Sequence, residues 1–420
     1  MSEFNAEKSK NLEFNEESSF TWAPLVPLIG GFPIGIEKAF GKPPELIASY
    51  DGIINDAHYV NYQQTTLNRD IPFKLYEAND DTFEQKINLI VCTPPCAGLS
   101  SLNTSKNPLK QGVNGEQNQH MYNCVFTAAK KFDADVIMIE NAPALATNKG
   151  KGVADKLYAL GKELGYSLTL YKTSTHFHGI PQRRDRTFAC FFKNKNAVVL
   201  EYQKVEHMPL LEFLKTMKNN IVNDETIINP QLLEKDVYYN FLKDTVDCPR
   251  DFCISANKVT CLNAVHKAGL TEEVTAYALE SGNKKWIKKV EHYNTKASQG
   301  LGVWDDSVHI FDDVINAVIG RNLNDTVHPE EDRSLTYHEA LYLMGFPENF
   351  ELLDGKKHIN HIAQNVPACT TKFMGEQAIK FLSGQLATSN DSDYIKVDNW
   401  NNKIEIRAEK DRNNLDNCFL

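Results

Sequence analysis

A cysteine directly after two prolines is the residue of this sequence best suited to covalent chemistry. Cys96 ends the stretch Thr93-Pro94-Pro95-Cys96. Because proline fixes φ and lacks an N–H group, the two prolines end the preceding apolar segment sharply. A lone cysteine is more often a buried structural residue, but such a cysteine usually lies inside an apolar run, as Cys92 does. The proline context therefore favours a nucleophilic thiol at position 96.

An acidic residue ends another apolar segment. Glu140 follows residues 136–139, which read Val-Ile-Met-Ile, and precedes Asn141-Ala142-Pro143. A carboxylate in such a place is unfavourable unless it is paired or functional. A helix cap or a salt bridge is the plainer alternative. The proline that follows stops the chain instead of starting a helix, and this favours a functional carboxylate.

Three polar side chains precede a further apolar segment with alternating spacing. Gln182, Arg184 and Arg186 fall on one side of an extended chain, and Arg183 and Asp185 fall on the other. The first side is predicted to face a cleft, where an arginine meets Glu140 or a carbonyl group of a base. A surface ladder of ion pairs with Asp185 is the alternative.

Short apolar segments that alternate with helical stretches supply the framework. The segments cover residues 23–29, 46–50, 87–92, 136–139, 168–171 and 187–192. This alternation predicts an α/β fold, a parallel sheet with helices on both faces. Ligands bind at the carboxyl ends of the strands in such sheets. Cys96 and Glu140 both come just after strand ends, so pattern and chemistry indicate one location. Gly30-Gly31, after the first segment, is a turn or a place where a cofactor approaches the backbone.

The bulk properties permit a folded protein of more than one domain. The chain has 420 residues, 42% hydrophobic and 24% charged, with a formal net charge of −10. No apolar run is long enough to cross a bilayer, and the N-terminus lacks a signal-peptide core. An acidic chain can still carry a basic cleft for nucleic acid. Lys284, Lys285, Lys288 and Lys289 form a basic cluster, more often a solvated helix face.

The cysteines argue against a metal site and against disulfides. There are nine, an odd number, spread singly. Cys92 and Cys96, and Cys248 and Cys253, are close in sequence, but neither pair has a second pair to complete a zinc site. We therefore expect no metal, and free thiols in a reducing, cytoplasmic environment.

The texture of the chain changes along its length. Residues 1–20 are polar and predict a flexible tail. Residues 199–330 have weak periodicity and predict a second, irregular domain. Helices are expected over residues 335–345, capped by Ser334 or Thr336, and over residues 370–386. Residues 387–420 are polar again and predict a loosely attached tail.

Together these elements resemble the DNA (cytosine-5)-methyltransferase family. The matching motifs are Pro94-Pro95-Cys96; Glu140-Asn141-Ala142; Gln182, Arg184 and Arg186; Arg333, Leu335, Thr336, Glu339, Gly345, Phe346 and Pro347; and Gln364-Asn365-Val366-Pro367. They occur in the order of the family. The resemblance implies a Rossmann-like methyltransferase sheet and a smaller, irregular target recognition domain.

The resemblance also implies domain boundaries. It assigns residues 21–198 to the catalytic methyltransferase domain and 199–330 to target recognition. Residues 331–358 are a hinge segment, and residues 359–386 return to the catalytic domain.

The resemblance further implies roles for individual residues. Cys96, Glu140, Arg184 and Arg186 are the expected catalytic residues. The expected cofactor contacts are Ile29, Gly30, Gly31, Asp51, Asp80, Pro94 and Asn365. The expected substrate contacts are Pro95, Ser100, Asn141 and Gln182. The expected cofactor is S-adenosylmethionine, the partner is double-stranded DNA, and the protein is a monomer of bacterial or phage origin, with any cognate nuclease unknown.

The first motif departs from that of the family. Phe-x-Gly-x-Gly-Gly is usual, and this chain has Val26, Pro27, Leu28, Ile29, Gly30 and Gly31. The departure keeps two alternatives open: a different one-carbon donor that supplies, for example, a hydroxymethyl group, and an inert relative that only binds DNA. An RNA substrate is a third alternative, because one methyltransferase of similar architecture modifies tRNA.

Overall fold

The chain forms two compact units in a computed structural model. The structure describes residues 17–50, 56–95, 98–99, 113–255, 260–301, 307–319 and 322–406. The first unit comprises residues 1–207, 344–351 and 364–420, and the second comprises residues 208–343 and 352–363. Among the described helices, none combines the length and apolarity that crossing a bilayer requires. The predicted tail over residues 1–20 lies mostly outside the described residues.

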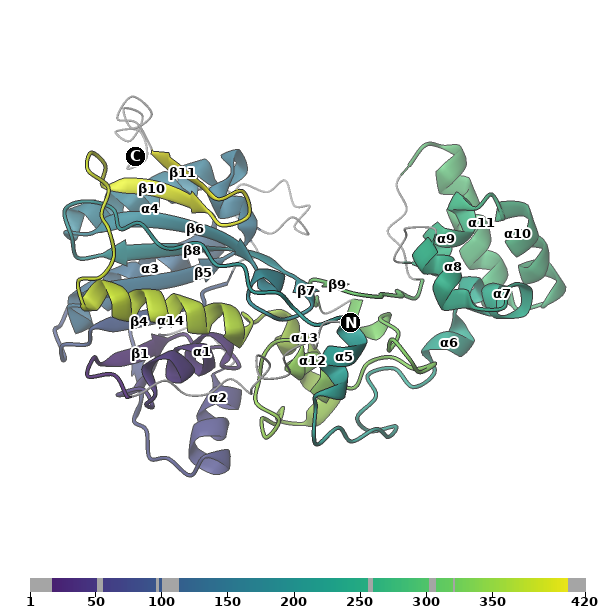
Figure 1. Ribbon diagram of the computed structural model, residues 1–420, viewed down its shortest axis with the longest axis horizontal. Helices are drawn as coiled ribbons and strands as arrows, with labels where there is room; N and C mark the ends of the chain where they lie inside the picture. The colour runs from purple at the N-terminus through teal and green to yellow at the C-terminus, as the bar shows by residue number, and fades with distance from the viewer. Residues whose placement is uncertain are drawn as a thin grey trace, which may run out of the picture. The chain divides into compact units, whose positions relative to one another are not determined.

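Nine strands of the described chain form one sheet in the first unit (Figure 1). They are β1 (Trp22–Leu25), β2 (Ile47–Tyr50), β3 (Phe73–Tyr76), β4 (Leu89–Cys92), β5 (Val136–Asn141), β6 (Ser167–Ser174), β8 (Asp185–Phe192), β10 (Tyr394–Asp398) and β11 (Lys403–Ile406). Their order is β11-β10-β6-β8-β5-β4-β1-β2-β3. The predicted α/β fold is confirmed, but the sheet is mixed, because β8 runs antiparallel to β5 and β6.

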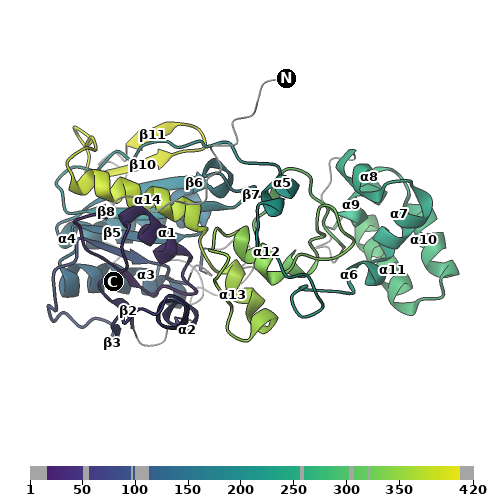
Figure 2. The same ribbon diagram turned by 60° about the horizontal axis from the view of Figure 1, so that its bottom comes forward.

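Helices cover both faces of this sheet, as predicted. On one face α3 (Glu116–Phe132) and α4 (Lys151–Glu163) pack on Ile90, Ile137 and Leu170. On the other face α1 (Gly31–Phe40) and α14 (Ala368–Leu382) pack on Val91 and Met138. Figure 2 shows α1 and α14 side by side. A helix α2 (Ala57–Asn61) continues into a π-helical turn (Tyr62–Thr66) after β2.

The predicted polar tail from residue 387 is wrong for the part that the structure describes. β10 pairs in parallel with β6, setting Tyr394 opposite Leu168, and β11 pairs antiparallel with β10. Tyr394, Ile395 and Val397 are buried, so a short apolar stretch is enough to fix this segment in the sheet. The apolar pattern of β10 is hard to recognise in the sequence because the residues around it are polar. The next strand, β11, lies at the exposed edge of the sheet, and none of its residues is buried.

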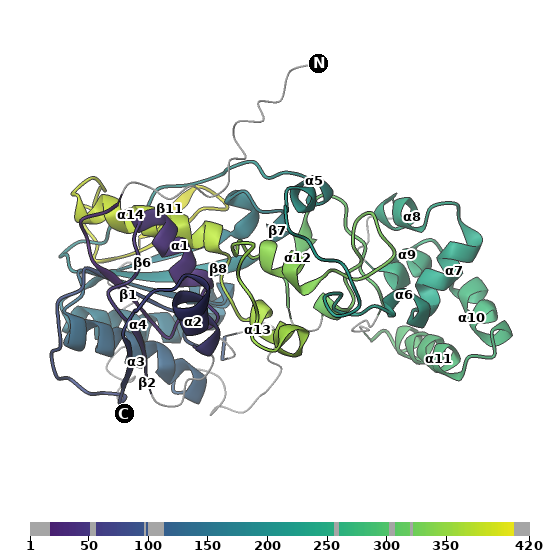
Figure 3. The same cartoon turned by 90° about the horizontal axis from the view of Figure 1, so that it is seen from below.

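The second unit contains more helix than its sequence predicts (Figure 3). The helices are α5 (Leu210–Lys215), α6 (Leu232–Lys235), α7 (Val237–Thr245), α8 (Pro249–Ser255), α9 (Cys261–Lys267), α10 (Thr271–Glu280), α11 (Lys284–Ser298), α12 (Tyr337–Tyr342) and α13 (Ile359–Ala363). Tyr238, Val265, Val274 and Val290 share one core. Most of these helices are short, so each offers few turns of periodicity.

Two local features of the second unit agree with the sequence predictions: an exposed lysine cluster and a helix cap. Lys284, Lys285 and Lys288 are exposed on α11, as a solvated helix face requires. Thr336, one of the two predicted caps, is the N-cap of α12 and forms a capping box with Glu339.

Candidate active site

A buried ion pair marks the carboxyl end of β5. Glu140 is 3% exposed, and its Oε1 lies 2.5 Å from Nε of Arg186. The antiparallel register of β5 and β8 sets Phe188 opposite Glu140, which brings the start of β8 to this edge. Burial raises the pKa of Glu140, while Arg186 and Arg184 act to lower it. Such a carboxyl group holds a proton more readily than an exposed glutamate does.

The other predicted polar residues of this edge are buried and engaged. Arg184 is 1% exposed and donates from Nη2 to the backbone oxygen of Asn365 at 2.6 Å. Gln182 is buried beside Met344, and Nε2 lies 3.4 Å from its Sδ. The Asn141 side-chain oxygen accepts from the Ala142 N–H at 2.9 Å and shapes the turn after β5. The alternating spacing thus predicted correctly that an arginine of this segment meets Glu140.

The turn after β1 holds non-glycine residues in the left-handed region. Val26 has φ 61° and Leu28 has φ 52°, and Gly30 follows with φ 113°. A β-branched residue rarely adopts a positive φ, and such strain, about 1–3 kcal/mol per residue, gathers at functional sites. The resembled family has glycine at the position of Leu28. Leu28 therefore adopts a positive φ, which glycine adopts without strain, although its own side chain disfavours it.

The two glycines of this turn make room for the protein's own chain. A Cβ on Gly30 would lie 2.5 Å from the Tyr59 ring, and a Cβ on Gly31 would lie 2.0 Å from the Val366 oxygen. The Gly31 N–H donates to Oδ1 of Asn365 at 2.7 Å. Gly31 and Asn365 were both expected to contact the cofactor, and this hydrogen bond joins them to each other. Ile29, also predicted there, is buried in the same turn.

Two buried polar groups beside this turn escaped the sequence prediction. Asp56 is 8% exposed, and its Oδ1 has no hydrogen-bond partner among the described residues. Burial raises the pKa of Asp56 to about 6, against the lowering effects of the Ser49 hydroxyl and the Leu28 backbone. Thr93 follows β4 and is 2% exposed. Its N–H donates to the Val26 oxygen at 3.3 Å, whereas its side-chain Oγ1 has no partner among the described residues. Unpaired buried polar atoms favour a polar ligand.

The remaining predicted residues fall into two groups. Pro94 is buried and Pro95 half-buried at the carboxyl end of β4, whereas Cys96, Ser100 and Asp51 lie outside the described residues. Asp80 is not brought to this edge. Its Oδ2 lies 2.5 Å from Nζ of Lys131, which belongs to the last turn of α3. The backbone oxygen of Lys131 accepts a hydrogen bond from Glu84, in the segment that leads into β4.

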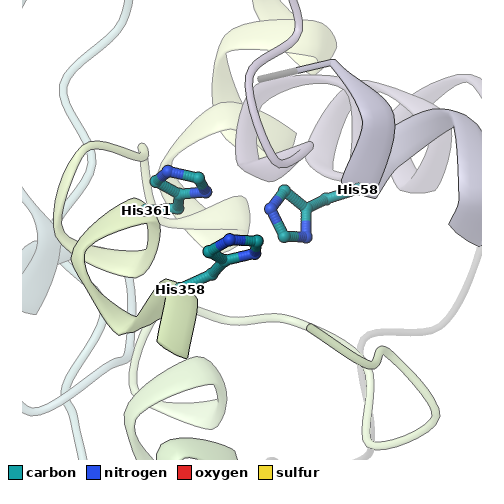
Figure 4. Close-up of side chains that lie close together, drawn as sticks. All are labelled: His58, His358 and His361. Atoms are coloured by element: carbon teal, nitrogen blue, oxygen red, sulfur yellow. The ribbon is translucent and has the colours of Figure 1, made fainter. Parts of the chain in front are cut away.

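Histidines gather in the second unit. The rings of His358 and His361 stack with centroids 5.0 Å apart (Figure 4). His58, drawn in the same figure, belongs to α2 of the first unit. Two histidines are fewer than the three protein ligands of a catalytic zinc site, so the described residues of the second unit alone offer no such site.

Comparison with known proteins bears on the chemistry of this edge. A model of the C-5 cytosine-specific DNA methylase family matches residues 21–379. A Type II methyltransferase of Bacillus paralicheniformis, M.Bpa9945I, is 22% identical over 291 residues, 63% of this chain. The aligned part spans 64% of that relative's length.

Solved structures resemble the fold. An Escherichia coli chain described as a DNA modification methyltransferase encoded within a prophage has a TM-score of 0.53 at 16% identity, over 87% of this chain and 100% of its own. The Entamoeba histolytica methyltransferase EhMeth has a TM-score of 0.51 at 15% identity, over 87% of this chain and 99% of its own. At such identities the likeness concerns the fold.

Proposed function

Because this chain belongs to the C-5 cytosine-specific DNA methylase family, we propose that it methylates carbon 5 of cytosine in double-stranded DNA. The observation that carries the proposal is the buried pair of Glu140 and Arg186 at the carboxyl edge of the sheet. Thr93, Pro94 and Pro95 follow the neighbouring strand β4 at its carboxyl end and directly precede Cys96 in sequence.

In the proposed mechanism the thiolate of Cys96 forms a bond to carbon 6 of the ring. Glu140 binds the ring nitrogen and the exocyclic amine, so that charge on the adduct is stabilised. Arg186 orients Glu140, and Arg184 holds the chain around residue 365. Carbon 5, made electron-rich by the adduct, accepts the methyl group. It then loses its proton to a base, and the thiolate leaves. A stacked base is out of reach of these groups, so the cytosine is flipped out of the duplex.

The residues around the β1 turn fit the expected methyl donor. S-adenosylmethionine, which supplies an electrophilic methyl group when bound, carries an ammonium group and hydroxyl groups that are hydrogen-bond donors. Oδ1 of Asp56 and Oγ1 of Thr93, which have no partner in the part of the chain that the structure describes, are acceptors beside the turn. We propose that these two residues, with Ile29 and the backbone of Gly30, hold it. Asp51 and Pro94 are further proposed contacts.

We further propose that the second unit reads the DNA sequence. The long insertion between β8 and α14 has the position of a target recognition domain. Sequence is read by side chains in a groove of DNA, which a separate unit can supply. Residues 199–330, the proposed recognition domain, lie mostly within this unit, and we keep residues 331–358 as the proposed hinge and residues 359–386 as the proposed return.

The test is to incubate DNA with the protein and isotope-labelled S-adenosylmethionine, then identify the modified nucleoside by mass spectrometry. We expect labelled 5-methylcytosine. Cys96→Ser should form no product while it still binds DNA, and DNA with 5-fluorocytosine should trap a covalent adduct. Normal turnover by the serine variant would remove Cys96 from the mechanism.

The altered first motif favours a second candidate, transfer of another one-carbon group such as hydroxymethyl. Leu28 fills space where the family has glycine, and it is 8% exposed. The same assay separates the two candidates: a product whose mass exceeds that of 5-methylcytosine by one oxygen, formed without S-adenosylmethionine, would replace the first.

A further inference from the structure

The hairpin of β10 and β11 lies beyond the residues that match the family. The family match ends at residue 379, whereas β10 begins at Tyr394. Because β10 runs parallel to β6, its carboxyl end reaches the same edge of the sheet as the ends of β5 and β6. The turn after β10 is thus an addition beside the proposed active site.

A buried asparagine fixes this turn. Asn399 is 0% exposed, and its Nδ2 donates to Oγ1 of Thr173 at 2.9 Å and to the Gln203 oxygen at 2.8 Å. Its Oδ1 accepts from the Gln203 N–H at 2.8 Å. Asp398 accepts from the Trp400 N–H at 3.0 Å. Asp398 also accepts from the Asn401 N–H at 3.3 Å, so the backbone is held on both sides of Trp400.

This fixed turn presents a large aromatic ring to solvent. Trp400 is 36% exposed. Its ring meets Phe177 with centroids 5.0 Å apart and His176 with centroids 5.2 Å apart, both edge to face. Phe177 and His176 follow β6, so two strand ends contribute to the cluster. Exposed aromatic groups on rigid backbone are typical of binding surfaces.

Positive charge accompanies the rings. Nζ of Lys204 lies 5.3 Å from the centroid of Phe177 and donates to the Trp400 oxygen at 3.1 Å. The acid of the turn, Asp398, is 6% exposed and lies 3.6 Å from Lys172. On a chain of net charge −10, aromatic rings with an exposed lysine form a surface complementary to nucleic acid.

A DNA strand that enters the proposed active site can also reach this aromatic cluster. Thr173 on β6 stands opposite Arg186 on β8, the partner of Glu140. β10 is three strands from β5, and neighbouring strands are about 4.8 Å apart, so the separation across the sheet is about 14 Å. A strand of B-DNA rises about 3.4 Å per nucleotide, so this separation corresponds to about four nucleotides.

We propose that Trp400, Phe177, His176 and Lys204, the Trp400 surface, bind a single-stranded segment of DNA next to the duplex being modified. An unpaired base stacks on the exposed indole, and Lys204 contacts a phosphate. Paired bases inside a duplex offer no free ring face, so the surface discriminates in favour of unpaired bases. The proposal rests on the proposed function, because it takes DNA as the partner.

The test compares a blunt DNA duplex with the same duplex carrying a single-stranded oligothymidine extension, by fluorescence anisotropy. The full-length protein should bind the extended duplex roughly tenfold more tightly. Trp400→Ala should lose this advantage, and Trp400→Phe should keep most of it. Lys204→Ala should lower the salt dependence of binding to the extended duplex by about one ion. Phe83→Ala is the matched control, because Phe83 is an exposed aromatic residue that lines a hollow with the last turns of α3 and α4.

The outcomes separate this proposal from the proposed function. Equal binding of the two duplexes by the wild-type protein would overturn the Trp400 surface and leave the methylation proposal standing. Binding of neither duplex would defeat both. A preference of tenfold or more for an oligouridine RNA extension would overturn the assignment to DNA. If Trp400→Ala fails to fold, Trp400→Phe and Lys204→Ala still decide, because loss of salt dependence requires the lysine to contact phosphate.

Discussion

The two halves of the sheet edge differ in how their polar groups are satisfied. At the end of β5, Glu140 is buried but paired with Arg186. Asp56, which follows β2, and Thr93, which follows β4, are buried with atoms that lack a partner in the described chain, beside the turn after β1 with its strained Val26. The polar groups of the first half satisfy each other, whereas the second half keeps the two atoms that we propose contact the methyl donor. Under the proposed function, this difference means that the site for the target base is preformed, whereas the proposed donor site keeps a strained turn.

The largest effect is expected from a change to the buried Glu140–Arg186 pair. Glu140→Gln should lower the rate of methyl transfer by about 10²–10³, because the amide cannot hold a proton for the ring nitrogen. Single-turnover transfer from labelled S-adenosylmethionine to DNA measures it. Binding of S-adenosylhomocysteine by calorimetry should stay unchanged, since Glu140 lies on the other half. An unchanged transfer rate would remove Glu140 from the chemistry.

A second change tests whether Gly31 serves the protein's own packing. Gly31→Ala sets a Cβ 2.0 Å from the Val366 oxygen, so the chain must shift, and we expect a loss of stability of about 3 kcal/mol. Chemical denaturation measures the change. Gly165→Ala is the control. Gly165 has φ 88° and open space around it, so only the backbone preference is lost, about 1–2 kcal/mol. Equal losses at the two positions would show that the close contact is unimportant.

A third change tests the burial of Asp56 through pH. Its pKa of about 6 lies above the ordinary value of 3.8, so its neutral form favours folding below pH 4 and this stability is lost as pH rises through 6. Asp56→Asn keeps a neutral group at every pH. The variant should gain up to about 3 kcal/mol relative to wild type at pH 8 and nothing from this source at pH 3.5. A stability difference that is independent of pH would contradict the raised pKa.

The smallest expected effect separates stability from ligand binding. Thr93→Val removes a buried hydroxyl whose oxygen lacks a partner among the described residues, so the ligand-free protein should gain about 1 kcal/mol. The same change should weaken binding of S-adenosylhomocysteine several-fold in calorimetry. Unchanged binding would mean that the Thr93 hydroxyl does not face the donor.

The sequence predicted the inner part of the sheet because its strands are apolar and buried on both faces. Residues 136–139 and 187–192 belong to strands of this kind. The edge strands β3 and β11 escaped prediction because water reaches them. Phe73 is 45% exposed and Ile406 62% exposed, and Tyr76 is the only buried residue in these two strands, so neither has the run of buried positions that marks an inner strand.

The site divides in the same manner. The spacing of Arg184 and Arg186 is a local pattern, and it correctly indicated a contact with Glu140. Asp56 carries no local signal, because its importance comes from burial by chain segments distant in sequence. Asp80 was expected at the cofactor only from the family resemblance, and its ion pair with Lys131 depends on a residue about fifty positions away, which no local pattern indicates.

Asn365 has a consequence for the order in which a growing polypeptide can fold. Its side chain holds Gly31, and its carbonyl holds Arg184, more than three hundred and nearly two hundred positions earlier. The apolar side of α1 is covered by α14, which is translated only after the whole second unit. A ribosome-bound chain therefore exposes that surface until synthesis is nearly over. Chaperone dependence during translation is the expected physiological cost of this connectivity.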